Sequence, residues 1–255
     1  MAKYFTILTT FSHLDVGKLS AFLKSADLKL KNFLTNYLEG KFNIDQIVNF
    51  LFLSPKEEKI IRFIFGFLLK NKEIQANEDL KKDILRSLKL FLLARDFYNI
   101  KDEKVLTTLL LYEFIFKLPL TPKQIEKQLG KELSDLILEI KNLKETPSKD
   151  NKAFITAELI NLIEDTINLT PILSKIRENP TDLNVRIEVR NELIQKFSQN
   201  LFQVKNLVKK EEPNEKIQEL YADFFKILSA NINHLKKIWK IYIEKGELEK
   251  EVENL

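Results

Sequence analysis

Apolar residues recur at every third or fourth position along most of this chain, which is the spacing of amphipathic helices. Strand-like alternation is nearly absent. The exception is residues 4–11, which fit either a short strand or a helical first turn. The pattern predicts an all-α protein. The expected helices cover residues 15–25, 28–39, 44–53, 55–72, 78–98, 102–117, 122–129, 132–145, 153–178, 182–210 and 214–245, with a short acidic helix from residue 247.

The expected helix ends carry local signals. Three capping boxes place a Ser, Thr or Asn three residues before a Glu or Gln, so that each side chain satisfies the other's free backbone N–H. They begin at Asn43, Ser54 and Thr121. Three glycines follow helical runs and are expected to end them. These are Gly40, Gly130 and Gly246. Pro171 is expected to break or kink the helix over residues 153–178, because proline lacks a backbone donor.

The two halves of the chain differ in their aromatic content and in the expected length of their helices. Most of the 19 Phe residues lie before residue 117, in short helices, which indicates a compact core. Beyond residue 150 the helices are long and their apolar positions follow heptads. The polar segment 145–152 is typical of a linker. We therefore expect a Phe-rich globular helical domain over residues 1–146, and a helical bundle over residues 153–255 that contains a coiled-coil-like antiparallel hairpin at residues 182–245.

The hairpin carries two apolar stripes that are expected to pack on each other. One consists of Tyr221, Phe225, Leu228, Ile232, Leu235, Trp239 and Tyr242. The other consists of Ile187, Arg190, Ile194, Phe197, Leu201, Val204 and Val208. In one interpretation both stripes are internal, with helix 153–178 as third partner. In the other, an aromatic surface around Phe224, Trp239 and Tyr242 stays open and binds another protein, because aromatic residues are favoured interface anchors. A homodimer through the hairpin is a variant of the second interpretation.

Residues 104–145 have the helix spacing of a helix–turn–helix module. Three lysines at its second helix are candidates for phosphate contacts. They are Lys123, Lys127 and Lys131. The expected recognition helix instead offers Glu132, Asp135 and Glu139, whose carboxylates would repel nucleic acid. A nucleic-acid-associated protein is therefore the alternative prediction.

Arg62 lies in the most apolar helix of the chain, and Glu113 lies in the next most apolar one. A buried arginine requires a partner of opposite charge. The two residues are therefore expected to form a structural ion pair.

Composition excludes several kinds of chemistry. The chain has no Cys and two His, so a thiolate metal site is excluded and a metal or cofactor is not expected. No catalytic constellation or phosphate-binding loop is present. The longest apolar runs are too short to span a membrane, and the first residues lack the features of a signal peptide. The sequence predicts a cytoplasmic, non-enzymatic adaptor or assembly protein that binds a protein partner through its hairpin.

Overall fold

A computed structural model describes residues 16–70, 78–117, 121–132, 134–135, 138–139, 151–179, 181–208 and 218–252. Within these ranges the regular structure is helical and contains no strand, which confirms the all-α class. The chain divides into two compact units, residues 21–157 and residues 158–255 together with the start of the chain up to Ser20. The boundary falls inside helix α10 (Asn151–Glu178). The predicted boundary at residues 146–153 stays a prediction.

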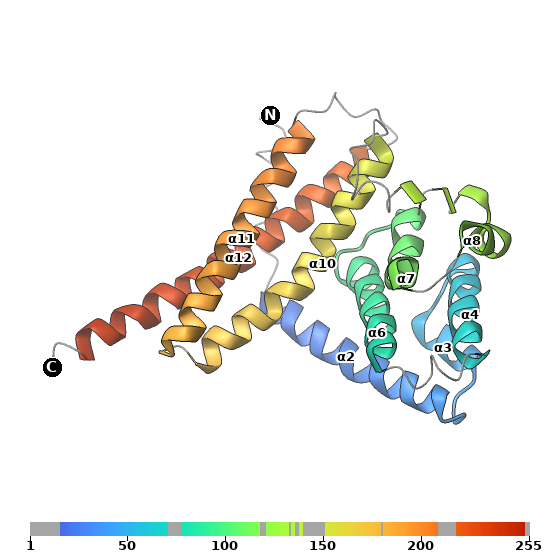
Figure 1. The fold of residues 1–255 in the computed structure, drawn as a ribbon, viewed down its shortest axis with the longest axis horizontal. Coiled ribbons are helices and arrows are strands. Elements are labelled where there is room, and N and C mark those ends of the chain that lie inside the picture. The colour runs from blue at the N-terminus through green and yellow to red at the C-terminus, as the bar shows by residue number, and fades with distance from the viewer. Residues whose placement is uncertain are drawn as a thin grey trace. The chain divides into compact units, whose positions relative to one another are not determined.

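The first unit is built from short helices (Figure 1). They are α2 (Val16–Leu38), α3 (Ile44–Leu51), α4 (Pro55–Lys70), α6 (Glu78–Leu92), the π-helical turn η1 (Leu93–Phe97), α7 (Glu103–Lys117) and α8 (Pro122–Leu129). Where two helices were expected over residues 15–39, α2 is continuous, because buried Leu23, Ala26 and Leu30 keep helical spacing across the expected break. Within this unit, helices α4, α6 and α7 contribute most of the fully buried aliphatic side chains.

The three expected capping boxes are present. The Asn43 side chain accepts a hydrogen bond from the Gln46 backbone at 3.0 Å, and the Gln46 side chain accepts one from the Asn43 backbone at 2.8 Å. Ser54 and Thr121 begin α4 and α8 in the same manner. Gly40 and Gly130 have φ angles of +71° and +93° at the ends of α2 and α8. Such angles strain any residue with a Cβ, which explains glycine there.

The second unit contains three long helices, α10, α11 (Leu183–Val208) and α12 (Gln218–Val252). Of the break or kink predicted at Pro171, the break is wrong, because helix α10 continues through this proline, which lies on its exposed side. The kink stays a prediction. Helix α12 continues through Gly246, so the expected stop there and the separate helix from residue 247 are also wrong. A glycine permits a helix end but does not impose one when the flanking residues favour helix.

The three long helices share one apolar core. It consists of Leu169, Ile172, Leu173, Ile176, Val189, Leu193, Leu235 and Ile238. Helices α11 and α12 run in opposite directions, as Figure 1 shows in orange and red. Asn231 joins α12 to α10 through two buried hydrogen bonds. The Thr166 hydroxyl donates to Asn231 Oδ1 at 2.7 Å. The Asn231 amide donates to the Leu162 carbonyl at 2.9 Å, so both ends of this side chain are satisfied.

Several predicted features fall outside the described residues. These are the segment 4–11, the linker up to residue 150 and much of the predicted helix 132–145. Among the helices that the structure does describe, none combines the length and the apolar composition that crossing a bilayer requires.

Candidate functional site: an exposed apolar face of the helical hairpin

Helix α11 carries two apolar stripes, and only one of them is buried. Val189 and Leu193 lie in the three-helix core, with Val185 packed against it. The predicted stripe is wrong over its first half, because Ile187 and Ile194 are 50% and 52% exposed. Both stripes repeat at helical spacing, so periodicity alone does not decide which of them packs.

The first residue of α11 extends the exposed stripe. Leu183 is 70% exposed and precedes Ile187 by one helical turn. On α12, Trp239 and Ile243 are each 40% exposed and also lie one turn apart. We call these five residues the hairpin face. They are Leu183, Ile187, Ile194, Trp239 and Ile243.

Arg186 joins the two helices beside the hairpin face. Its guanidinium lies over the Tyr242 ring, 4.4 Å from the ring centroid, and donates to the Tyr242 carbonyl at 3.1 Å. The Tyr242 ring stacks in turn on Trp239, with centroids 5.5 Å apart and ring planes 19° from parallel. Arg186, Tyr242 and Trp239 therefore form one layer that holds α11 and α12 in register at the exposed end of their contact.

Two of the three aromatic residues singled out from the sequence lie at this surface. Trp239 is on the hairpin face, and Tyr242 is half-buried beneath it. Phe224 is fully buried at 0% exposure and packs edge-on against Phe225, so its assignment to an open surface is wrong. The stripe on α12 is wider than a heptad seam, because Phe224 and Ile227 are buried together with the predicted Leu228.

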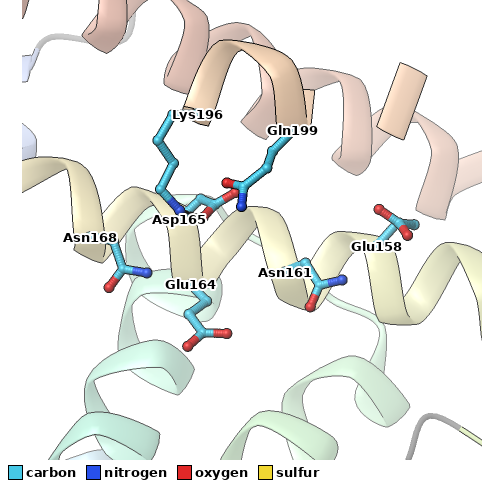
Figure 2. A pocket seen from close by; sticks show the side chains of 7 residues that line it. All are labelled: Glu158, Asn161, Glu164, Asp165, Asn168, Lys196 and Gln199. Carbon is cyan, nitrogen blue, oxygen red and sulfur yellow. Dashed lines mark hydrogen bonds and ion pairs between the residues drawn. The ribbon is translucent and has the colours of Figure 1, made fainter. Parts of the chain in front are cut away.

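A polar groove lies on the other side of α11, against α10 (Figure 2). It has a volume of about 380 Å³ and is lined by Glu158, Asn161, Glu164, Asp165, Asn168, Lys196 and Gln199. Lys196 reaches from α11 and forms an ion pair with Asp165 on α10. Burial raises the pKa of Asp165, and the hydrogen bond from Lys196 opposes that rise. The pairing neutralises two largely buried charges of the groove within the protein itself.

His234, one turn beyond Asn231 on α12, is buried at 2% exposure. Neither of its ring nitrogens has a hydrogen-bond partner. Burial, with the nearby charges of Lys237 and Arg177, lowers its pKa to about 4. The imidazole is therefore neutral at pH 7. This burial was not predictable from the heptad pattern, because His234 lies beside the predicted stripe rather than in it.

The ion pair between Arg62 and Glu113 was predicted because Arg62 was expected to be buried, and the structure contradicts that burial. Arg62 is exposed and contacts Asp45 and, at 2.7 Å, Glu58. The side chain of Glu113 lies outside the described residues. Arg95, by contrast, is partly buried and donates to the Leu51 carbonyl at the end of α3, at 2.7 Å.

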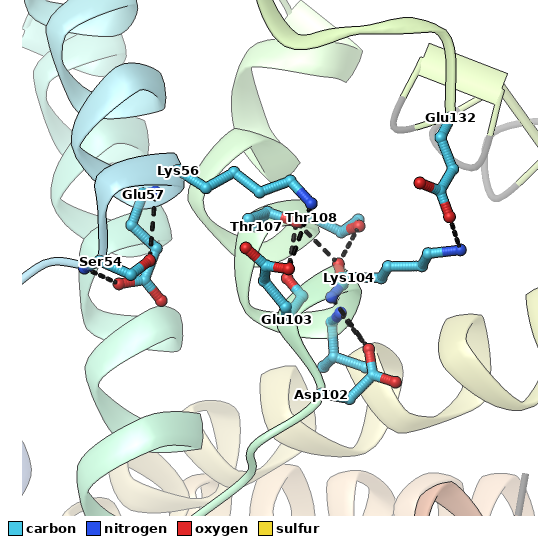
Figure 3. Close-up of polar contacts among 10 residues, drawn as sticks. Ser54, Lys56, Glu57, Asp102, Glu103, Lys104, Thr107, Thr108 and Glu132 are labelled. Atoms are coloured by element: carbon cyan, nitrogen blue, oxygen red, sulfur yellow. Dashed lines mark hydrogen bonds and ion pairs between the residues drawn. The ribbon is translucent and has the colours of Figure 1, made fainter. Parts of the chain in front are cut away.

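The lysines of the helix–turn–helix-like segment are at the surface. Lys123 and Lys127 on α8 and Lys131 just beyond it are all exposed. Glu132, from the expected recognition helix, forms an ion pair with Lys104 at the start of α7 (Figure 3). The Ser134 hydroxyl donates to the Pro122 carbonyl at 3.2 Å. Ser134 and Glu132 thus attach the start of the expected recognition helix to α8 and α7. The Glu132 carboxylate directly follows Lys131 in the chain.

In the part of the chain that the structure describes, no three His, Asp or Glu residues lie close enough together to hold a metal ion. No model of a protein family, no curated protein and no solved structure matches this chain. The exposed hairpin face is therefore identified from its own geometry.

Proposed function

We propose that this protein is a non-enzymatic adaptor or assembly subunit that binds a protein partner through the hairpin face. One observation carries the proposal. Seven large apolar side chains are exposed among the described residues, and five of them belong to α11 and α12, the other two being Leu28 and Phe52. Scattered exposed apolar residues are ordinary, but a cluster on one pair of helices is typical of an interaction surface.

The hairpin face is held ready for binding. Its two helices are fixed by the three-helix core and by the layer of Arg186, Tyr242 and Trp239. A rigid surface loses little conformational entropy when a partner binds, so more of the contact energy remains as affinity. Trp239, which is partly exposed and stacked on one side, has the properties of an anchor residue.

The test is affinity capture of the tagged protein from its native lysate, with the bound proteins identified by mass spectrometry. Ile187→Ser/Ile194→Ser removes apolar surface and leaves the buried stripe intact. Leu28→Ser is the control, because Leu28 is 64% exposed on a different helix, α2. We expect the double variant to lose a partner that the control keeps, with both retaining the helical circular dichroism of the wild type. A double variant that keeps every partner would refute the proposal.

The alternative, a nucleic-acid-associated protein, draws on the exposure of Lys123, Lys127 and Lys131. A nuclease-treated half of the same lysate separates the two functions. Partners lost on nuclease treatment, and lost again in Lys123→Ala/Lys127→Ala, would favour the alternative. Phosphate contacts would also make binding strongly dependent on salt.

A further inference from the structure

The hairpin face has the dimensions of a helix-binding surface. From Leu183 to Ile194 the exposed stripe of α11 extends for roughly 16 Å, at about 1.5 Å per residue. That is the length of about three turns of a second helix. Trp239 and Ile243, one turn apart, add two exposed apolar side chains on α12. Two rows of this kind suit a helix that presents apolar residues at positions i, i+3 or i+4, and i+7.

The charges of α11 are sorted between its two sides. Its acidic residues in this region, Glu188 and Glu192, both bind Lys175 of α10, at 2.6 and 3.2 Å. The side that carries the exposed stripe has Arg190 between Ile187 and Ile194, and Arg190 is exposed. The carboxylates are therefore drawn toward α10, and the charge left on the hairpin-face side of α11 is positive.

Helix α12 extends the same sign of charge. Lys236 precedes Trp239 by three residues, and Lys240 precedes Ile243 by three residues, so each lysine shares a helix side with an exposed apolar residue. Both lysines are exposed. The acidic residue nearest to them in sequence is Glu244, which lies 3.5 Å from Lys240. Among the side chains that the structure describes, the rim of the hairpin face thus carries the basic residues Arg190, Lys236 and Lys240 and one acidic residue, Glu244.

The positive charge of the rim favours some binding partners of the hairpin face over others. A second copy that used the same face would bring one basic rim, with Arg190, Lys236 and Lys240, against an identical basic rim, and like charges across an interface are unfavourable. A partner with acidic residues beside its apolar stripe would place opposite charges there instead.

We propose, resting on the function proposed above, that the occupant of the hairpin face is an acidic amphipathic helix of another protein. Its apolar residues pack between the exposed stripe of α11 and Trp239, and its Asp and Glu residues meet Arg190, Lys236 and Lys240. Apolar contact supplies most of the affinity. The basic rim supplies the preference for an acidic partner and raises the rate of association.

Trp239 allows a direct test on the unmodified protein, because it is the only tryptophan of the chain. Its emission is expected to shift to shorter wavelength when a helix covers it. The probes are two synthetic 18-residue amphipathic helices with the same leucine stripe, one flanked by glutamates and the other by lysines. We expect the glutamate peptide to bind at least about tenfold more tightly, since a few exposed ion pairs contribute this much together. We also expect this preference to fade as salt is raised.

A second experiment reverses the charge of the two lysines on α12 and repeats the comparison of the two peptides. Lys236→Glu/Lys240→Glu should abolish the preference for the glutamate peptide or invert it. Lys24→Glu/Lys29→Glu makes the same change in net charge at exposed positions of α2 and should leave the preference unchanged. Equal binding of both peptides, binding of neither, or an unchanged preference in Lys236→Glu/Lys240→Glu would overturn the proposal.

Other occupants would produce different results. A shift of Trp239 emission with phosphatidylserine vesicles but not with the glutamate peptide would overturn the proposal in favour of a membrane surface. A dimer in sedimentation equilibrium that Ile187→Ser dissociates would overturn it in favour of a second copy. If affinity capture shows a partner that depends on the hairpin face while the peptides show no charge preference, this inference fails and the proposed function stands. If capture shows no such partner, the proposed function itself fails.

Discussion

Replacement of His234 by leucine should stabilise the protein. The imidazole is buried at 2% exposure, and neither nitrogen has a hydrogen-bond partner. A buried polar group without a partner costs about 1–3 kcal/mol. The change of side-chain shape in a packed core opposes this gain by up to about 1.5 kcal/mol. We therefore expect His234→Leu to raise the free energy of unfolding at pH 7 by about 1 kcal/mol.

The same substitution should change how stability depends on pH. The pKa of His234 is lowered to about 4 in the folded protein, from 6.5 for the unperturbed group. Between these two values the unfolded chain binds a proton that the folded protein does not. The free energy of unfolding therefore falls as the pH falls below 6.5, and the loss levels off below about pH 4. At 1.36 kcal/mol for each pKa unit, the full loss is about 3 kcal/mol, of which about 2 kcal/mol has occurred by pH 5.

The assay is urea denaturation of wild type and His234→Leu at several values between pH 7 and pH 5, followed by Trp239 fluorescence. Trp239 follows His234 on α12 and reports the same unit. Carboxylates titrate in both proteins, so they cancel in the difference between them. We expect that difference to grow by about 2 kcal/mol toward pH 5. A difference that stays constant across this range would show that the imidazole is hydrated or paired in solution, and would refute the reasoning.

Three further substitutions test other buried contacts. Thr166→Val leaves the carbonyl oxygen of Asn231 without its hydroxyl donor, and should lower the free energy of unfolding by about 1–3 kcal/mol in urea denaturation; no loss would mean that water replaces the hydroxyl. Arg95→Met removes the donor to the carbonyl at the end of α3, so the free energy of unfolding should fall by about 1.5–3 kcal/mol and the melting temperature with it. Arg62→Met, at the exposed ion pair, should change the melting temperature little. Equal effects of the two substitutions would contradict the assigned burial. Lys196→Met leaves Asp165 on α10 without its ion-pair partner, so the free energy of unfolding should fall by about 2 kcal/mol. The pKa of Asp165, followed by NMR, should rise further. An unchanged pKa would show that the ion pair does not form.

Features with local causes were predictable from the sequence. The boxes at Asn43, Ser54 and Thr121 formed as expected because both partners of each hydrogen bond lie within four residues. The all-α class followed from helical spacing along nearly the whole chain. The local signal failed at Gly246, because α12 passes through it. Packing along a long helix outweighs the small cost of one unfavourable residue.

The candidate surface was only partly predictable. Trp239 and Tyr242 were identified from aromatic character within a heptad pattern, and both lie at or beside the exposed face. Phe224 is also aromatic, but it lies outside the predicted heptad stripe and is buried, so aromatic character alone did not identify the exposed residues. Arg62 was expected to be buried because its neighbours are apolar, yet its side chain leaves the helix toward Asp45 and Glu58.

The sequence by itself therefore determined the helical class, the capped helix starts and the glycine stops at residues 40 and 130, because each depends on neighbours a few residues away. The tertiary structure alone decided which stripe of α11 packs, which aromatic residues stay exposed, and that His234 is buried without partners. A helix with two apolar stripes can bury either one at similar cost. The choice between them depends on helices α10 and α12, which are separate elements of the chain and pack on α11 only in the folded protein.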